Sequence, residues 1–211
     1  MNSTLLESVR RELVAEAQSS PKMLQDLAGL ERYVAQTYAT RSFVELLQNA
    51  DDAGATRVKF GIRDEHLFCA NDGRLFSESD FRSLCRSASS SKRRGDSIGY
   101  RGIGFKSVAG IASRVYLISG DLEATFDREL TRRDVGGDGD TPLIRIPHAM
   151  ALNGESQVLR HATDLVQSGF NTVFILDGLA RIAVEEELVA FDSDYLIFLR
   201  NVEGVDIATP T

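Results

Sequence analysis

The sequence predicts an α/β fold in which a mixed, largely antiparallel sheet is covered by helices on one face. Helical and strand-like patterns alternate irregularly along the chain, and several neighbouring strand-like segments are separated only by short turns. The chain has 211 residues, a length that suits one large domain with a buried core. We therefore expect a single domain over residues 1–211, beginning with a helical segment at 1–30.

The order of the elements follows from the spacing of apolar residues. Recurrence with the period of a helix predicts helices, alternation or a short apolar run predicts strands, and glycine or proline ends them. Ser77, with Asp80 three residues later, is the pattern of a capping box, so a helix is expected to begin there. Expected helices cover 3–18, 23–27, 41–53, the stretch after Ser77, 105–111 and 184–199; expected strands cover 56–62, 66–70, 114–119, 122–126, 143–146, 172–176 and 202–208.

Composition and charge narrow the class of protein. The net charge of -7, from 24 basic and 31 acidic side chains, argues against a surface built mainly to hold nucleic acid. No apolar run reaches membrane-spanning length, and the first residues lack the apolar core of a signal peptide. We expect a cytoplasmic protein that does not enter a membrane.

The first group of candidate site residues lies on one predicted helix. Glu45, Asn49 and Asp52 fall within a narrow sector of that helix, and an apolar stripe occupies the opposite side. A carboxylate can orient or deprotonate a water, and an amide oxygen can bind a hard cation such as Mg²⁺. A polar helix face that merely meets solvent is the alternative, and taken alone it is the commoner case.

The second group follows a predicted strand. Asn71, Asp72 and Gly73 are turn formers, so a plain turn is one interpretation. The other is a base-binding position, where a side-chain oxygen accepts a hydrogen bond from the exocyclic amine of adenine and Gly73 lets the base approach the backbone.

The third group is a glycine box at 99–104, inside a polar stretch that predicts a phosphate-binding lid over 86–104. Its glycines can turn backbone amides toward an anion, and serines, lysines and arginines precede it. A P-loop would need its lysine directly after the last glycine, but Phe105 intervenes before Lys106. A dinucleotide-binding fingerprint fails as well, because Ser107 holds the place of the third glycine. A surface loop is the alternative.

Together, the three groups resemble the GHKL ATPase superfamily of gyrase, the large heat-shock chaperone, histidine kinases and MutL. The closer match is to its sacsin-like branch, through Glu-x-x-x-Asn-x-x-Asp-Ala in 43–53, the serines and lysine of 89–92, the glycine box in 98–108, and the segments 171–174 and 196–202. The resemblance implies a two-layer Bergerat-type sandwich that binds ATP and Mg²⁺.

The resemblance also implies roles for single residues. Glu45 would be the general base, Asn49 the magnesium ligand and Asp52 a support on the nucleotide side, while Thr172 would reach adenine. The residues expected to bind the nucleotide are Asn49, Asp52, Ala53, Asn71, Asp72, Gly73, Ser91, Lys92, Gly99, Arg101, Gly102, Ile103, Gly104, Phe105, Lys106 and Thr172.

Two features depart from the family pattern. The family usually has Asp-x-Gly at the adenine contact, and Asn71, not Asp72, stands in that place, although an asparagine oxygen could also accept from the amine. The chain also lacks the following transducer domain that supplies a cation to the terminal phosphate. We therefore expect the N-terminal part of a longer protein, with slow hydrolysis and nucleotide-dependent homodimerisation.

An ATP-driven conformational switch in a chaperone-like or defence-associated protein is the function we expect. A nucleotide-binding module without hydrolysis is the main alternative, and Glu45 argues against it. Phosphoryl transfer to histidine is disfavoured because the three histidines are isolated. A nucleic-acid role would rest on the basic residues of 82–106, which ATP phosphates explain more economically.

Overall fold

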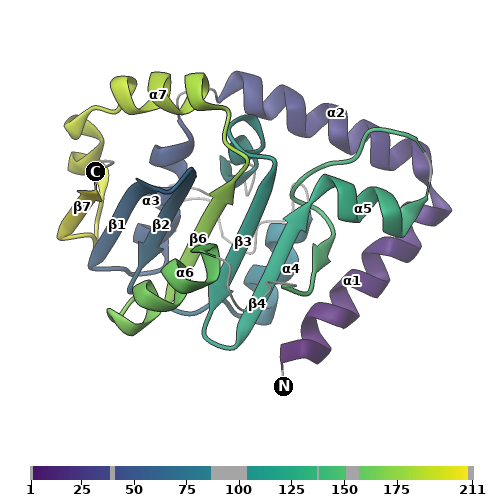
Figure 1. Ribbon diagram of the computed structural model, residues 1–211, viewed down its shortest axis with the longest axis horizontal. Coiled ribbons are helices and arrows are strands. Elements are labelled where there is room, and N and C mark those ends of the chain that lie inside the picture. Colours follow the sequence, from purple (N-terminus) through teal and green to yellow (C-terminus); the bar gives the residue numbers. More distant parts are fainter. Residues whose placement is uncertain (1, 39–40, 87–103, 137, 151–156, 209–211) are drawn as a thin grey trace.

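The computed structural model describes residues 2–38, 41–86, 104–136, 138–150 and 157–208. Its centre is a seven-stranded sheet in the order β5-β4-β3-β6-β2-β1-β7 (Figure 1). Neighbouring strands are antiparallel except β1 and β7, which are parallel. The strands are β1 (Arg57–Arg63), β2 (His66–Asn71), β3 (Arg114–Ser119), β4 (Leu122–Asp127), β5 (Pro147–His148), β6 (Thr172–Asp177) and β7 (Gly204–Ala208).

The helices lie mainly on one face of this sheet, which confirms the predicted fold class (Figure 1). The capping box at Ser77 and Asp80 is present at the start of its helix. The helices are α1 (Asn2–Ser19), α2 (Pro21–Thr37), α3 (Ser42–Asp52), α4 (Glu78–Cys85), α5 (Arg128–Val135), α6 (Gln157–Gln167) and α7 (Arg181–Ala190), with two 3-10 helices, η1 (Gly104–Gly110) and η2 (Ser193–Phe198).

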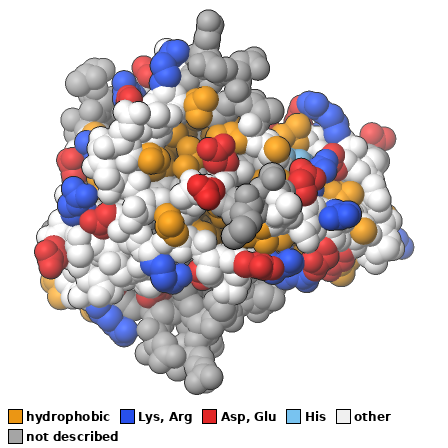
Figure 2. Space-filling view, turned by 90° about the horizontal axis from the view of Figure 1, so that it is seen from below, with side chains coloured by type: hydrophobic (Ala, Val, Ile, Leu, Met, Phe, Trp, Pro, Cys, Tyr) orange, Lys and Arg blue, Asp and Glu red, His pale blue; other side chains and the backbone are white. Residues whose placement is uncertain are grey.

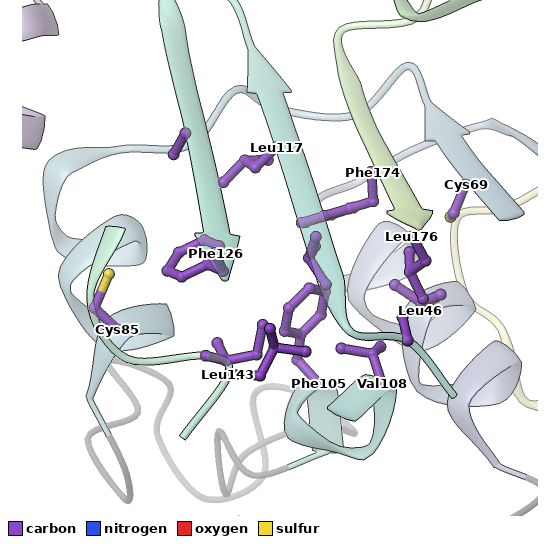
Figure 3. Close-up of a cluster of buried hydrophobic side chains, with 14 of the residues drawn as sticks. Leu46, Cys69, Cys85, Phe105, Val108, Leu117, Phe126, Leu143, Phe174 and Leu176 are labelled. Carbon is purple, nitrogen blue, oxygen red and sulfur yellow. The ribbon is translucent and has the colours of Figure 1, made fainter. Parts of the chain in front are cut away.

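Alternate residues of the strands serve two separate cores. In β2, Leu67 and Cys69 face the larger core, which the helices on the main face complete. Phe68 and Ala70 point to the other face, where α6 covers a smaller core. Figure 3 shows part of the larger core, in which Phe105 of η1 lies near Phe174 of β6.

Several predicted boundaries differ from the structure. The apolar run 143–146 is fully buried but forms no strand; only Pro147–His148 pairs with β4. The reason is a competing acceptor, because the backbone N–H groups of Leu143 and Ile144 donate to the carboxylate of Glu31 instead of to a neighbouring strand.

Three expected helical segments also differ from the structure. The stretch expected at 105–111 is the 3-10 helix η1, the short pattern at 23–27 extends into the long α2, and 184–199 is divided between α7 and η2. Helices α5 and α6 were not predicted; α5 follows β4 directly, with Asp127 as its N-cap.

The end of α3 is held by Asp51, a residue that the sequence analysis did not select. Its side chain is buried and accepts hydrogen bonds from the backbone N–H groups of Arg200, Asn201 and Val202. The amide of Asn201 donates in turn to the Asp51 carbonyl. One carboxylate therefore joins α3 to the segment that leads into β7.

Asp51→Ala should lower the free energy of unfolding by about 3 kcal/mol, because it leaves several backbone donors without their charged acceptor. Urea denaturation measures the change. Asp121→Ala, an exposed position in the turn between β3 and β4, is the matched control and should change stability by less than about 0.5 kcal/mol. Equal stability of the two variants would contradict this role of Asp51.

Candidate functional site

The pocket of interest lies between α3, α4, η1 and the ends of β2 and β6. Seen from below, hydrophobic side chains gather near the middle of this face, and acidic side chains lie beside them (Figure 2). The lining residues are Glu45, Leu46, Asn49, Ala50, Asp52, Ala53, Asn71, Arg74, Leu75, Phe76, Asp80, Ser83, Leu84, Gly104, Phe105, Thr172 and Phe174. The structure thus brings together candidates from all three groups of the sequence analysis.

Helix α3 presents the first group. Glu45, Asn49 and Asp52 are half-buried and line the pocket, whereas Phe43 and Leu47 on the opposite side are buried in the larger core. The amphipathic spacing therefore fixes the rotation of the helix about its axis. Carboxylate and amide groups share one wall of the pocket as a result.

The last glycine of the glycine box lies against Glu45. A Cβ added at Gly104 would overlap the Oε2 and Cδ atoms of that carboxylate, so a larger residue here would require the Glu45 side chain to move. Gly104 is the described residue of the box, and both it and the adjacent Phe105 line the pocket. The other predicted phosphate-binding residues, Ser91, Lys92, Gly99, Arg101, Gly102 and Ile103, lie outside the described residues, as does most of the predicted lid.

Three polar side chains form a row across the sheet, and two of them, Asn71 and Thr172, line the pocket. Asn71 of β2 is paired with Thr172 of β6, which is paired with Ser119 of β3. The hydroxyls of Thr172 and Ser119 are 2.8 Å apart, and Ser119 also accepts from the backbone N–H of Phe76. The sequence analysis missed Ser119, which the antiparallel register of the strands could have indicated.

Asp72 points away from this row. Its carboxylate accepts from the backbone N–H groups of Thr56 and Arg57 and from both of their side chains. Partial burial opposes ionisation, yet these hydrogen bonds, led by that from Arg57, hold the pKa of Asp72 at about 2. Asp72 therefore fixes the start of β1, and it does not line the pocket.

Close packing explains why position 73 is a glycine. A Cβ there would lie 3.0 Å from the carbonyl oxygen of Ala53, and the next backbone N–H, that of Arg74, donates to the same oxygen. The glycine thus lets the turn pack against the end of α3. Unlike Ala53, it does not line the pocket.

Lys106 also lies outside the pocket. It is only 4% exposed, and its Nζ donates to the carbonyl of Ile144. Burial lowers the pKa of Lys106, and the nearby carboxylate of Glu31 opposes that shift. Within the described residues, Lys106 therefore does not join Gly104 and Phe105 in lining the pocket.

Within the described residues, no group of three or more His, Cys, Asp or Glu side chains could hold a metal ion by itself. Among the described helices, none is long and apolar enough to cross a membrane.

Comparison with known proteins identifies the family. The family described as Sacsin domain matches residues 24–167, about two thirds of the chain. The chain belongs to the sacsin-domain family. No curated protein matches it. Among solved structures, a similar chain is described as the N terminal domain of a DNA repair protein, with 14% identity and a TM-score of 0.44; the match covers 76% of this chain and 42% of that one.

The beginning of α3 in this sacsin domain depends on a carboxyl group from α7. Glu187 is buried and accepts from the backbone N–H of Phe43. Its Oε2 atom has no hydrogen-bond partner within the described part of the chain. Burial raises the pKa of Glu187 to about 7, against the hydrogen bonds from Phe43 and Ser42. The helix that carries Glu45 thus begins at a group that titrates near neutrality.

Glu187→Gln should make the sacsin domain less sensitive to pH. The folded protein keeps the Glu187 proton up to about pH 7, whereas the unfolded chain loses it near the ordinary glutamate pKa of 4.5, so stability falls as pH rises between these values. The glutamine variant should be more stable than wild type at alkaline pH, by about 1–3 kcal/mol. This difference in the free energy of unfolding should shrink as the pH falls toward 4.5. Thermal unfolding across this range measures it, and Glu185→Gln, exposed on the same helix, should retain the wild-type pH dependence.

Gly104→Ala should destabilise the domain by about 1 kcal/mol, because the new methyl group must displace the carboxylate of Glu45 from its place against η1. Gly29→Ala is the matched control. It lies within α2 with nothing near its added Cβ, so alanine should stabilise the domain there by about 1 kcal/mol. Changes of the same sign in both variants would contradict the close approach at Gly104.

Proposed function

We propose that this sacsin domain binds ATP together with Mg²⁺ and hydrolyses the nucleotide slowly, as a conformational switch within a larger protein. The observation that supports the proposal is the single pocket shared by the polar face of α3, the end of β2, the start of β6 and the start of η1. These segments are far apart in the sequence. Their convergence gives a carboxylate, an amide and a glycine backbone to one concave site, the arrangement expected of a nucleotide-hydrolysing site.

Two residues of α3, Glu45 and Asn49, suit different roles in hydrolysis. Glu45 would orient the attacking water and accept its proton. Asn49 would offer its amide oxygen to the metal ion, whose remaining ligands would be phosphate oxygens and waters, as Mg²⁺ sites in proteins commonly have. When bound, Mg²⁺ would supply neutralisation of the developing charge on the phosphates.

The charges along the pocket support a need for a cation. Glu45, Asp52 and Asp80 line it, and Arg74 is the one cationic side chain in the described lining. Arg74 is itself paired with Asp80 at 2.7 Å. A triphosphate would meet a negative wall here, so an accompanying cation is electrostatically favoured.

A nucleic-acid role receives less support. Arg82 forms ion pairs with Glu12 and Glu78, and Arg86 pairs with Glu12 as well. Lys106 is buried. These members of the basic segment therefore contribute little free positive charge to a surface that could hold a phosphate backbone.

Glu45→Gln should preserve ATP binding but lower the rate of phosphate release by about 100-fold, because glutamine cannot accept the proton of the water. Calorimetry with and without Mg²⁺ measures binding, and a phosphate-release assay measures turnover. Glu123→Gln, an exposed position on β4, is the control and should behave as wild type.

Two outcomes would reject parts of the proposal. Absence of binding for both ATP and ADP in the presence of Mg²⁺ would reject a nucleotide site. Binding of ATP with equal phosphate release from wild type and Glu45→Gln would favour the non-hydrolysing alternative.

A further inference from the structure

Asn71 presents a hydrogen-bond donor to the pocket. The side chain is 5% exposed and lines the pocket beside Thr172. Its Oδ1 accepts from the backbone N–H of Gly73 at 3.1 Å. Since that N–H can only donate, the atom that faces it must be the oxygen, which leaves the amide nitrogen on the other side. Within the described residues, Nδ2 has no hydrogen-bond partner.

Rotation of the amide by half a turn would be unfavourable. It would place the NH₂ group against the N–H of Gly73, so that two donors face each other and the turn loses its internal hydrogen bond. An aspartate at this position would differ, because one carboxylate oxygen could accept from Gly73 while the other still offered an acceptor to the pocket. The asparagine therefore offers the pocket a hydrogen-bond donor where an aspartate would offer an acceptor.

The neighbouring hydroxyls do not determine whether a bound base must donate or accept a hydrogen bond. Thr172 and Ser119 share one hydrogen bond in which either oxygen could be the donor. A hydroxyl both donates and accepts, so Thr172 can serve a base edge of either kind. Discrimination along this row then rests on Asn71.

Purine bases differ at the matching position. Adenine carries a 6-amino group, which donates, whereas guanine and hypoxanthine carry a 6-oxo group, which accepts. We propose that Asn71 is a specificity-determining residue that lets this pocket take 6-oxopurine nucleotides at least as well as ATP. The inference rests on the proposed nucleotide function and concerns only the base that the site prefers.

Competition calorimetry with Mg-ATP and Mg-ITP tests the inference, because these nucleotides differ only at the 6-position and the adjacent ring nitrogen of the base. Wild type should bind ITP at least as tightly as ATP, and GTP should serve as a second 6-oxopurine. Asn71→Asp should shift the ITP-to-ATP affinity ratio toward ATP by about tenfold or more, because a carboxylate accepts from the 6-amino group and repels the 6-oxo group.

Asp72→Asn is the matched control. This substitution makes the reverse change, from carboxylate to amide, one residue away and outside the pocket. It should leave the ITP-to-ATP affinity ratio unchanged, even though it weakens the start of β1. Tighter binding of ATP than of ITP by wild type would overturn the inference while leaving the proposed function intact. An unchanged ratio in a folded Asn71→Asp variant would also overturn it. If no nucleotide binds to wild type, the proposed function itself fails.

Discussion

Gly104 begins η1 directly against the carboxylate of Glu45, so any side chain at position 104 would displace that carboxylate. The rest of η1 is enclosed on its other sides. Gly110 lies against Ala35 of α2, where an added Cβ would be 3.2 Å from the alanine methyl, and Phe105 stacks near Phe174 with ring centroids 4.8 Å apart. These contacts hold the backbone that ends the glycine box beside α3. The shape of the pocket depends on that position.

Helix α3 is held at both ends by carboxyl groups. Glu187 accepts from its first turn, and Asp51 at its last turn accepts from backbone N–H groups of the segment before β7. Both contacts connect α3 to the last third of the chain, although α3 lies in the first third. Any rearrangement of α7 or of the approach to β7 would therefore be transmitted to Glu45 and Asn49. This coupling gives a physical route by which a conformational switch could connect the pocket to distant segments.

Local periodicity was enough to predict one wall of the site. Glu45 and Asn49 share a helix face whatever the rest of the fold does, so their grouping follows from sequence spacing alone. The choice between Asn71 and Asp72 could not be made in this way. Both precede Gly73, and only the pairing of β2 with β6 and β1 shows that Asn71 lies beside Thr172 while Asp72 binds Thr56. Likewise, the acceptor that prevents 143–146 from pairing as a strand comes from α2, more than a hundred residues earlier.

Lys106 shows why a sequence motif can wrongly predict that a charged side chain lies in a binding site. The expectation that it faces phosphate assumed an α-helix after the glycine box, but the segment is a 3-10 helix in which four consecutive side chains are buried. The lysine Nζ instead donates a hydrogen bond to the carbonyl of Ile144, while the carboxylate of Glu31 accepts from the N–H of the same residue. A buried cation and a buried anion thus bind one peptide segment from both sides, and each reduces the cost of burying the other. Because this cation serves the fold, charge neutralisation in the described pocket falls to groups other than Lys106.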